Sequence, residues 1–111
     1  MTAMTLLKMC SIQDVPEGEA RQFTLPNGTL ISIANLGADE GWRAIDDVCS
    51  HEESYLHEGE VDADFETIEC PKHGSVFDLN TGKPRSLPAT IPLPVYPVKV
   101  EGDDVLIEVE E

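Results

Sequence analysis

Turn-forming residues divide this sequence of 111 residues into short segments. Segments of this length can form β-strands but not long helices, and this limits the folds that the chain can adopt. The strongest turn signal is Pro26–Asn27–Gly28, because Asn–Gly between two alternating runs favours a tight β-hairpin. No stretch of 11 or more residues keeps a helical period, whereas Val105, Ile107 and Val109 alternate as in a half-buried strand. The pattern therefore predicts an all-β, antiparallel protein. The expected strands are residues 4–9, 21–25, 29–36, 42–48, 75–79, 95–101 and 105–109, with a loop-rich insert over residues 49–93.

Acidic residues dominate the charge of the chain. Twenty-two Asp and Glu stand against seven Lys and Arg, which gives a formal net charge of −15 at pH 7. Such a surface would repel nucleic acid and anionic membranes, and would attract a partner with a basic face. Ten of the acidic residues lie between Ala44 and Pro71, where there is no Lys or Arg. A run of this kind is usually a solvated face, and a docking surface is the alternative.

The cysteine content and the first residues indicate a compartment. Met1 to Cys10 has no basic start and no long apolar run, so it is not typical of a signal peptide. No segment approaches the roughly 20 apolar residues that span a bilayer. Three cysteines in such a chain favour the reducing cytoplasm, where cysteines near histidines are more often metal ligands than disulfide partners.

Two short motifs in the irregular region carry metal-binding chemistry. They are Cys49–Ser50–His51 and Cys70–Pro71–Lys72–His73–Gly74, and each supplies one thiolate and one imidazole. One intervening residue would place Cys49 and His51 on the same side of an extended segment. Two Cys and two His can also bind zinc, although zinc motifs usually pair Cys with Cys and His with His. Buried thiols and surface histidines without any metal are the remaining alternative.

The two motifs resemble those of the Rieske proteins, C-x-H followed by a spacer and C-x-x-H-G. The similarity runs from about Leu6 to Val109, and includes Leu56, Glu58, Gly59, Phe77, Asp78, Thr81, Gly82, residues 87–90 and residues 96–100. The resemblance implies one [2Fe–2S] cluster held by Cys49 and Cys70 on the inner iron and by His51 and His73 on the outer iron. It also implies a single domain over residues 1–111, an antiparallel β-sandwich. A cluster-binding lobe would occupy about residues 45–93, with a third loop around Pro88.

The resemblance further implies an electron carrier and not an enzyme, since the chain shows no nucleophile–base set and no flavin or nucleotide motif. Stand-alone Rieske ferredoxins typically pass electrons from a flavin-containing, NAD(P)H-dependent reductase to a Rieske non-haem-iron oxygenase, such as an aromatic-ring hydroxylating dioxygenase. Two alternatives remain open. The chain could be a small redox or regulatory subunit of another oxidoreductase, or a zinc-stabilised interaction module.

The loop residues bear on the reduction potential. High-potential Rieske proteins have a disulfide between their ligand loops and hydroxyl donors from a Ser and a Tyr. Here Ser54 and Lys72 occupy the disulfide positions, Phe77 replaces the Tyr, and Ser75 matches the Ser. With the acidic surroundings, this predicts a potential in the lower part of the Rieske range of about −150 to +300 mV.

Three further residues receive less specific interpretations. Cys10 has no metal-binding companion nearby, so we expect a core thiol. His57 could tune or gate the cluster, but a solvated loop histidine is favoured. Trp42 follows a turn and is expected to pack on the sheet, with an electron-transfer or docking role as the alternative.

Overall fold

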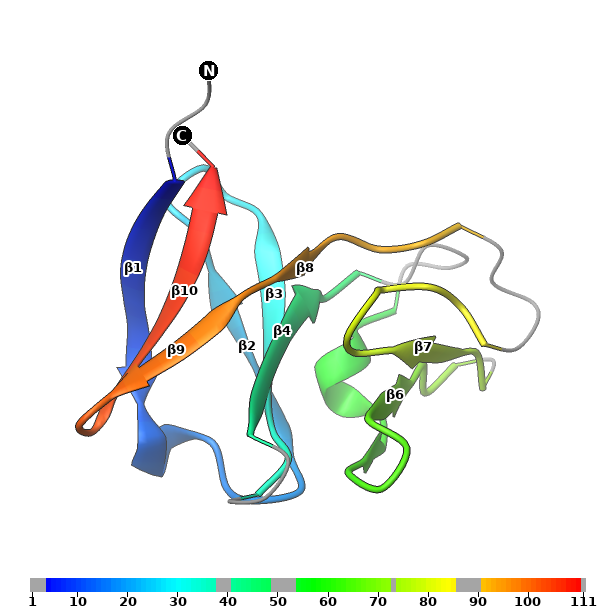
Figure 1. The fold of residues 1–111 in the computed structure, drawn as a ribbon. Coiled ribbons are helices and arrows are strands. Elements are labelled where there is room, and N and C mark those ends of the chain that lie inside the picture. Colours follow the sequence, from blue (N-terminus) through cyan, green and yellow to red (C-terminus); the bar gives the residue numbers. More distant parts are fainter. Residues whose placement is uncertain (1–3, 38–40, 49–53, 73, 86–90, 111) are drawn as a thin grey trace.

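The computed structural model describes residues 4–37, 41–48, 54–72, 74–85 and 91–110, which form an all-β fold (Figure 1). The described helical elements are two short 3-10 turns, so the expected fold class is confirmed. No described helix has the length and apolar character needed to cross a membrane. In chain order the elements are β1 (Met4–Ser11), η1 (Ile12–Asp14), β2 (Ala20–Thr24), β3 (Leu30–Asn35), β4 (Trp42–Asp46), η2 (Leu56–Glu58), β5 (Val61–Asp62), β6 (Thr67–Glu69), β7 (Val76–Asp78), β8 (Val95–Tyr96), β9 (Val98–Glu101) and β10 (Asp104–Glu110).

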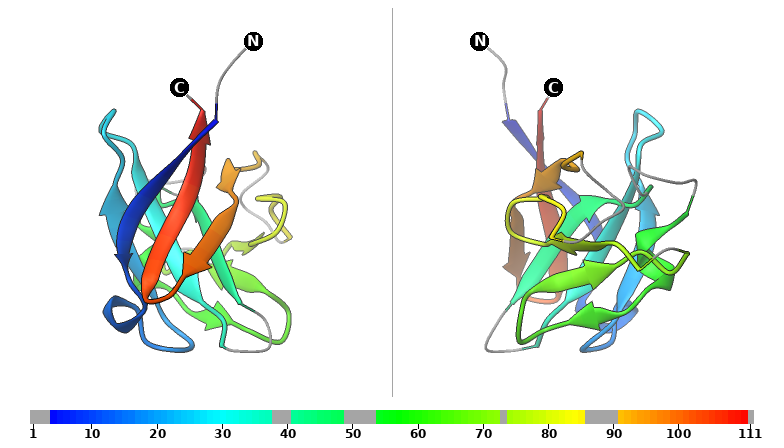
Figure 2. Two further views of the ribbon diagram at one scale, coloured as in Figure 1. Left: turned by 60° about the vertical axis from the view of Figure 1, so that its left-hand side comes forward. Right: turned by 90° about the vertical axis from the view of Figure 1, so that its right-hand side faces the viewer.

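The strands form three antiparallel sheets. The first has the order β1-β10-β9, the second β2-β3-β4-β8 and the third β5-β6-β7. The first two sheets face each other as a sandwich, and the small third sheet lies on the other side of the second (Figures 1 and 2). The second sheet is therefore the middle layer of the molecule.

Strand β3 shows why the middle layer can carry two cores. Its residues 31–34 are all buried, which is possible only where both faces of a strand are covered. Ile31 and Ile33 point into the sandwich core, and Ala34 points into the core beneath the third sheet. The sandwich core consists of Cys10, Val15, Leu25, Ile31, Ile33, Ala44, Val105 and Ile107. The second core consists of Ala20, Ala34, Leu36, Ile45, Leu56, Ile68, Cys70, Phe77, Leu79 and Leu93.

The expected hairpin at Pro26–Asn27–Gly28 joins β2 to β3 and is confirmed. The Asn27 side chain accepts a hydrogen bond from the Thr29 N–H at 2.9 Å, and the Gly28 N–H donates to the Leu25 carbonyl at 2.9 Å. Gly28 has a φ of +92°, in the left-handed region that favours glycine. Local turn chemistry thus sets the register of the middle sheet.

Two strand predictions are wrong in detail. Residues 95–101 do not form one strand, because Pro97 lacks an N–H and separates β8, on the middle sheet, from β9, on the first sheet. The region predicted to be mostly loops contains β5 and β6, which pair with each other and with β7. Strands of two and three residues are too short to show a period of two, so the sequence pattern does not predict them.

Candidate metal centre

Cys70 is the one proposed cluster ligand that lies within the described residues. It follows β6 and is fully buried in the second core. Its N–H donates to the Ser75 carbonyl at 2.7 Å, and its carbonyl accepts the Gly74 N–H at 2.9 Å. Gly74 has a φ of +73°, which lets the chain reverse within this motif. Cys49, His51 and His73 lie outside the described residues, as does the loop around Pro88.

The flanks of the first motif are described, and they pair with each other. Val48 and Tyr55 pair in an antiparallel bridge, and the Leu56 N–H donates to the Asp47 carbonyl at 2.7 Å. Leu56 is fully buried and packs in the same core as Cys70. The fold therefore brings the flank of the first motif and the thiol of the second motif to one core.

A carboxylate at the end of β7 organises the turn that follows it. Asp78 Oδ1 accepts the N–H groups of Asn80 and Thr81 at 2.7 and 3.2 Å, and Oδ2 accepts Arg85 Nη2 at 2.7 Å. Burial alone would raise the pKa of Asp78, but these hydrogen bonds and the Arg85 charge outweigh burial and hold the pKa below its usual value. Arg85 directly precedes residues 86–90, which lie outside the described residues, so this ion pair holds the last described residue before that segment.

His57 is not a solvated loop histidine, and that prediction is wrong. Its side chain is 23% exposed, and its Nδ1 lies 2.7 Å from Oδ2 of the fully buried Asp47. Asp47 also accepts the His57 backbone N–H at 2.8 Å and Gln22 Nε2 at 2.7 Å. The sequence alone does not single out Asp47, because one acidic residue within a long acidic run gives no sign that it is buried. Asp47 comes immediately after the strand 42–46, but this position indicates burial only when it is known that η2 covers the end of that strand.

The acidic stretch is less uniformly solvated than the run of charge indicates. Asp47 is buried, Glu66 pairs with Arg43 at 2.6 Å, and Asp46 accepts the Tyr96 hydroxyl at 2.6 Å. Burial raises the pKa of Asp46, and the bond from Tyr96 opposes this only in part. The described acidic side chains of this stretch that are exposed are those of Glu58, Glu60, Asp62 and Asp64.

Cys10 and Trp42 have the structural roles expected of them. Cys10 is buried in the sandwich core, where burial and the nearby Asp14 charge raise the pKa of its thiol to about 11. A thiol with that pKa is almost wholly protonated at neutral pH and is a poor metal ligand. Trp42 is half-buried and packs against the same core.

The residues around Cys70 suit a buried iron–sulfur group. Phe77 is fully buried in the core that holds Cys70, and Ser75 is buried in the turn beside it, whereas Lys72 is exposed. A thiolate donor in an apolar, water-excluding core is the environment that Fe–S clusters occupy. The described residues contain no separate group of three or more His, Cys, Asp or Glu side chains that could hold a metal ion.

Comparison with known proteins agrees with this chemistry. Residues 5–97 match the family model of the Rieske [2Fe–2S] domain. The chain is 43% identical over 108 residues to the 3-phenylpropionate/cinnamic acid dioxygenase ferredoxin subunit of Shigella boydii, with 97% of each chain covered. It also resembles the ferredoxin of carbazole 1,9a-dioxygenase from Nocardioides aromaticivorans, at a TM-score of 0.85 and 32% identity over 93% of this chain and 96% of that one.

A third match adds a bound partner. A solved complex of reduced oxygenase and oxidized ferredoxin in carbazole 1,9a-dioxygenase contains a chain with a TM-score of 0.81 and 33% identity, covering 92% of this chain and 91% of that one. These relatives are ferredoxins, which carry electrons and do not catalyse the oxygenation themselves. The burial of Cys70, the all-β layers and the match over residues 5–97 lead to one conclusion. The chain belongs to the Rieske [2Fe–2S] domain family and is an electron-carrying ferredoxin with one such cluster.

Proposed function

We propose that this ferredoxin carries single electrons from a flavin-containing, NAD(P)H-dependent reductase to a terminal Rieske non-haem-iron oxygenase of the aromatic-ring hydroxylating kind. The observation that supports this most strongly is the 43% identity to a dioxygenase ferredoxin subunit along 97% of both chains. The relative that is solved together with its oxygenase supports the acceptor. The reductase is the donor that such a carrier requires.

The proposed ligands are Cys49 and Cys70 on the inner iron and His51 and His73 on the outer iron. When bound, the cluster supplies a one-electron couple. Two neutral imidazoles in place of two thiolates leave the oxidised site less negative, which raises its potential above that of four-cysteine ferredoxins. Cys70, buried in the second core, would keep the inner iron away from water. The whole chain would form one domain, with residues 45–93 as the cluster-binding lobe.

The exposed acidic side chains provide a docking surface for a partner with a basic face. Glu58, Glu60, Asp62 and Asp64 all belong to the segment that follows the first ligand motif. Charges of one sign near the electron port would steer the encounter and make its rate depend on salt. We place this carrier in the cytoplasm, where a core thiol such as Cys10 needs no disulfide partner.

The potential is expected in the lower part of the range of about −150 to +300 mV. The Phe77 side chain cannot donate a hydrogen bond to the cluster. The electron gained on reduction would also be close to negatively charged side chains, which disfavour the reduced state. Phe77→Tyr should raise the potential if the new hydroxyl reaches a cysteine sulfur. Protein-film voltammetry of both proteins measures this, and a wild-type value above about +150 mV would refute the low-potential assignment.

The function is tested by reconstitution. The purified protein should hold two irons and two acid-labile sulfides per chain, and its reduced form should give the paramagnetic signal of mixed His/Cys ligation. It should accept electrons from a flavin-dependent ferredoxin reductase and restore turnover of a purified ring-hydroxylating oxygenase, at a rate that falls as salt rises. Replacing Glu52, Glu53 and Glu58 together by Gln should weaken that salt dependence. Zinc at one per chain without labile sulfide would exclude the proposal.

A further inference from the structure

Asp47 is a fully buried carboxylate in a position where burial is costly. It lies directly after β4 and two residues before Cys49. A buried carboxylate persists only where donors satisfy its oxygens. Its Oδ1 accepts the His57 N–H at 2.8 Å, and its Oδ2 accepts Gln22 Nε2 at 2.7 Å. The remaining close contact is between Oδ2 and His57 Nδ1, at 2.7 Å.

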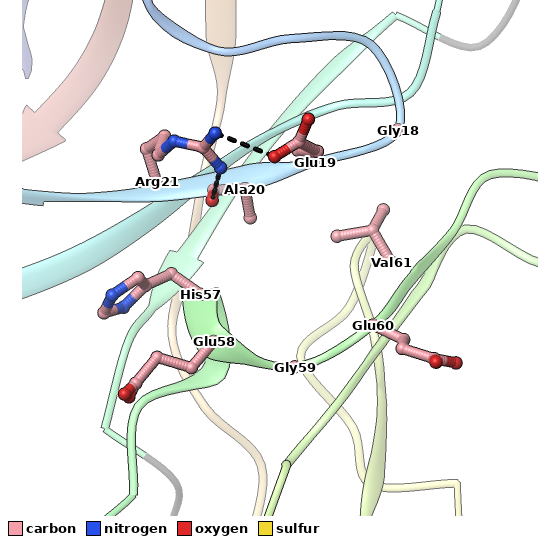
Figure 3. A pocket seen from close by; sticks show the side chains of 9 residues that line it. All are labelled: Gly18, Glu19, Ala20, Arg21, His57, Glu58, Gly59, Glu60 and Val61. Atoms are coloured by element: carbon pink, nitrogen blue, oxygen red, sulfur yellow. Dashed lines mark hydrogen bonds and ion pairs between the residues drawn. The ribbon is translucent and has the colours of Figure 1, made fainter.

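The chemistry of that contact fixes the role of the His57 ring. If Asp47 is a carboxylate, it can only accept hydrogen bonds, and Nδ1 of His57 then carries the proton of this contact. In that tautomer the ring is a third donor to Asp47 within the part of the chain that the structure describes. Figure 3 shows the His57 side chain at one side of a shallow pocket of about 360 Å³, which is also lined by Gly18–Arg21 and Glu58–Val61. Arg21, which lines the same pocket, bonds to Glu19 at 2.7 Å.

The same two residues hold both ends of the first ligand loop. Asp47 precedes the loop, His57 follows it, and the Val48–Tyr55 bridge lies just inside them. The Asp47 carbonyl accepts the Leu56 N–H, and the Asp47 side chain contacts His57. Both the backbone and the side chain of Asp47 therefore bind the segment that follows the first motif. Fixing the ends of a short loop restricts the positions that its residues can reach. Groups behind the ligands are known to orient metal sites in this way.

We propose that Asp47 and His57 are positioning residues. The Nδ1–H of His57 holds the buried Asp47 carboxylate, and the pair holds the first ligand loop in the geometry that the cluster requires. The pair also sets how much uncompensated negative charge lies beside that loop, and through this charge it affects the reduction potential. This inference rests on the proposed assignment of Cys49 and His51 as ligands.

The test compares His57→Leu, which removes the donor, with His57→Asn, whose side-chain amide can still donate from about the position of Nδ1. Lys8→Leu is the matched control, because it removes the basic partner of Asp104 in an exposed pair on the first sheet. Iron and sulfide content, the half-life of the oxidised cluster against a chelator and the reduction potential are measured for each holoprotein. Far-UV circular dichroism of the iron-free forms reports on the sandwich.

In His57→Leu we expect the cluster half-life to fall by about 10- to 100-fold, which is the factor by which metal affinity usually falls when a group that orients metal ligands is lost. The potential of the remaining cluster should fall, because the Asp47 charge is less compensated. His57→Asn should recover most of both values, and Lys8→Leu should match the wild type. A lower potential in His57→Leu that His57→Asn restores supports the proposal whether or not the half-life changes.

An unchanged potential in His57→Leu overturns the positioning role, even if the cluster is lost faster, because a merely stabilising contact would give that result. If His57→Leu holds no cluster although its iron-free form folds like the wild type, recovery of the cluster in His57→Asn supports the proposal, and failure to recover overturns it. A wild-type protein without iron and labile sulfide would instead refute the proposed function, and the two failures are therefore distinguishable.

Discussion

The sandwich and the β5-β6-β7 region are stabilised in different ways. The sandwich has strands of up to eight residues and a core made of aliphatic side chains and the Cys10 thiol. The β5-β6-β7 region also packs on a buried apolar core, but its strands have only two or three residues and its turns depend on charged and polar side chains such as Arg43, Asp78 and Arg85. The hydrophobic effect is non-directional, so buried apolar area stabilises a strand without fixing the exact positions of its atoms. Hydrogen bonds in turns, by contrast, fix the positions of the backbone groups that they join. We therefore expect the first region to support the molecule and the second region to position the proposed ligands Cys70 and His73.

This difference predicts that the sandwich folds without the cluster. Cys70→Ser should eliminate stoichiometric iron while the amides of β3 and β10 remain protected from hydrogen exchange. Protection at Gly74 and Leu79 should be lost. Cys10→Ser is the matched control, since it should keep the iron and lower the free energy of unfolding by about 1–3 kcal/mol through a buried hydroxyl. Loss of protection throughout Cys70→Ser would mean that the two regions fold as one unit.

Two glycines separate backbone strain from close packing. Gly82 has a φ of +78°, and a Cβ there would overlap the Leu93 carbonyl oxygen. Gly28, in the sandwich hairpin, has a φ of +92° with open space around it. Gly82→Ala should cost roughly 3 kcal/mol or more, because strain and overlap add, and Gly28→Ala about 1 kcal/mol. If urea unfolding gives the same loss of free energy for Gly82→Ala and Gly28→Ala, backbone strain alone accounts for both losses.

Arg43 connects the two regions through polar contacts. From β4 it donates to Glu66 Oε1 at 2.6 Å and to Asn80 Oδ1 at 2.7 Å, both in turns of the β5-β6-β7 region. Arg43→Met should cost about 2 kcal/mol, since the Arg43–Glu66 pair is only about one-quarter exposed. Lys99→Met should change stability by less than about 0.5 kcal/mol, because its pair with Glu101 is exposed. In Arg43→Met, amide hydrogen exchange should accelerate more at Leu79 than at Ile33, which would place the lost stability in the β5-β6-β7 region. Equal acceleration at both amides would contradict this prediction.

The smallest expected effect is on the pH dependence. Because the folded pKa of Asp78 is below its usual value, its contribution to stability is complete above about pH 4 and is lost as the pH falls through the folded pKa. For Asp46, whose pKa is raised, the sign is opposite, and acid favours the folded state. The difference in urea midpoint between wild type and Asp78→Asn should therefore narrow below about pH 4. A difference that stays constant from pH 7 down to about pH 3 would exclude Asp78 as the source.

The sequence by itself was sufficient to determine the fold class, the hairpin at Asn27–Gly28 and the family. These features depend on neighbouring residues, because turn chemistry and strand alternation act over two to four positions. The two Cys/His motifs are equally local, and their resemblance to Rieske proteins agrees with the family match over residues 5–97. All four proposed ligands remain predictions, and three of them, Cys49, His51 and His73, lie outside the described residues.

Only the tertiary structure decided which polar residues are buried and which strands share a sheet. Asp47 and Asp46 are adjacent and chemically identical, yet Asp47 faces η2 and is fully buried, while Asp46 reaches Tyr96 from the other side. Pro97 predicts a break in a strand, but not that the two halves join different sheets. Burial depends on what covers a side chain, and in this protein the covering layer comes from residues far away in the sequence. No local pattern can encode that, because the free energy of a buried carboxylate is set by partners that only the folded chain brings into contact.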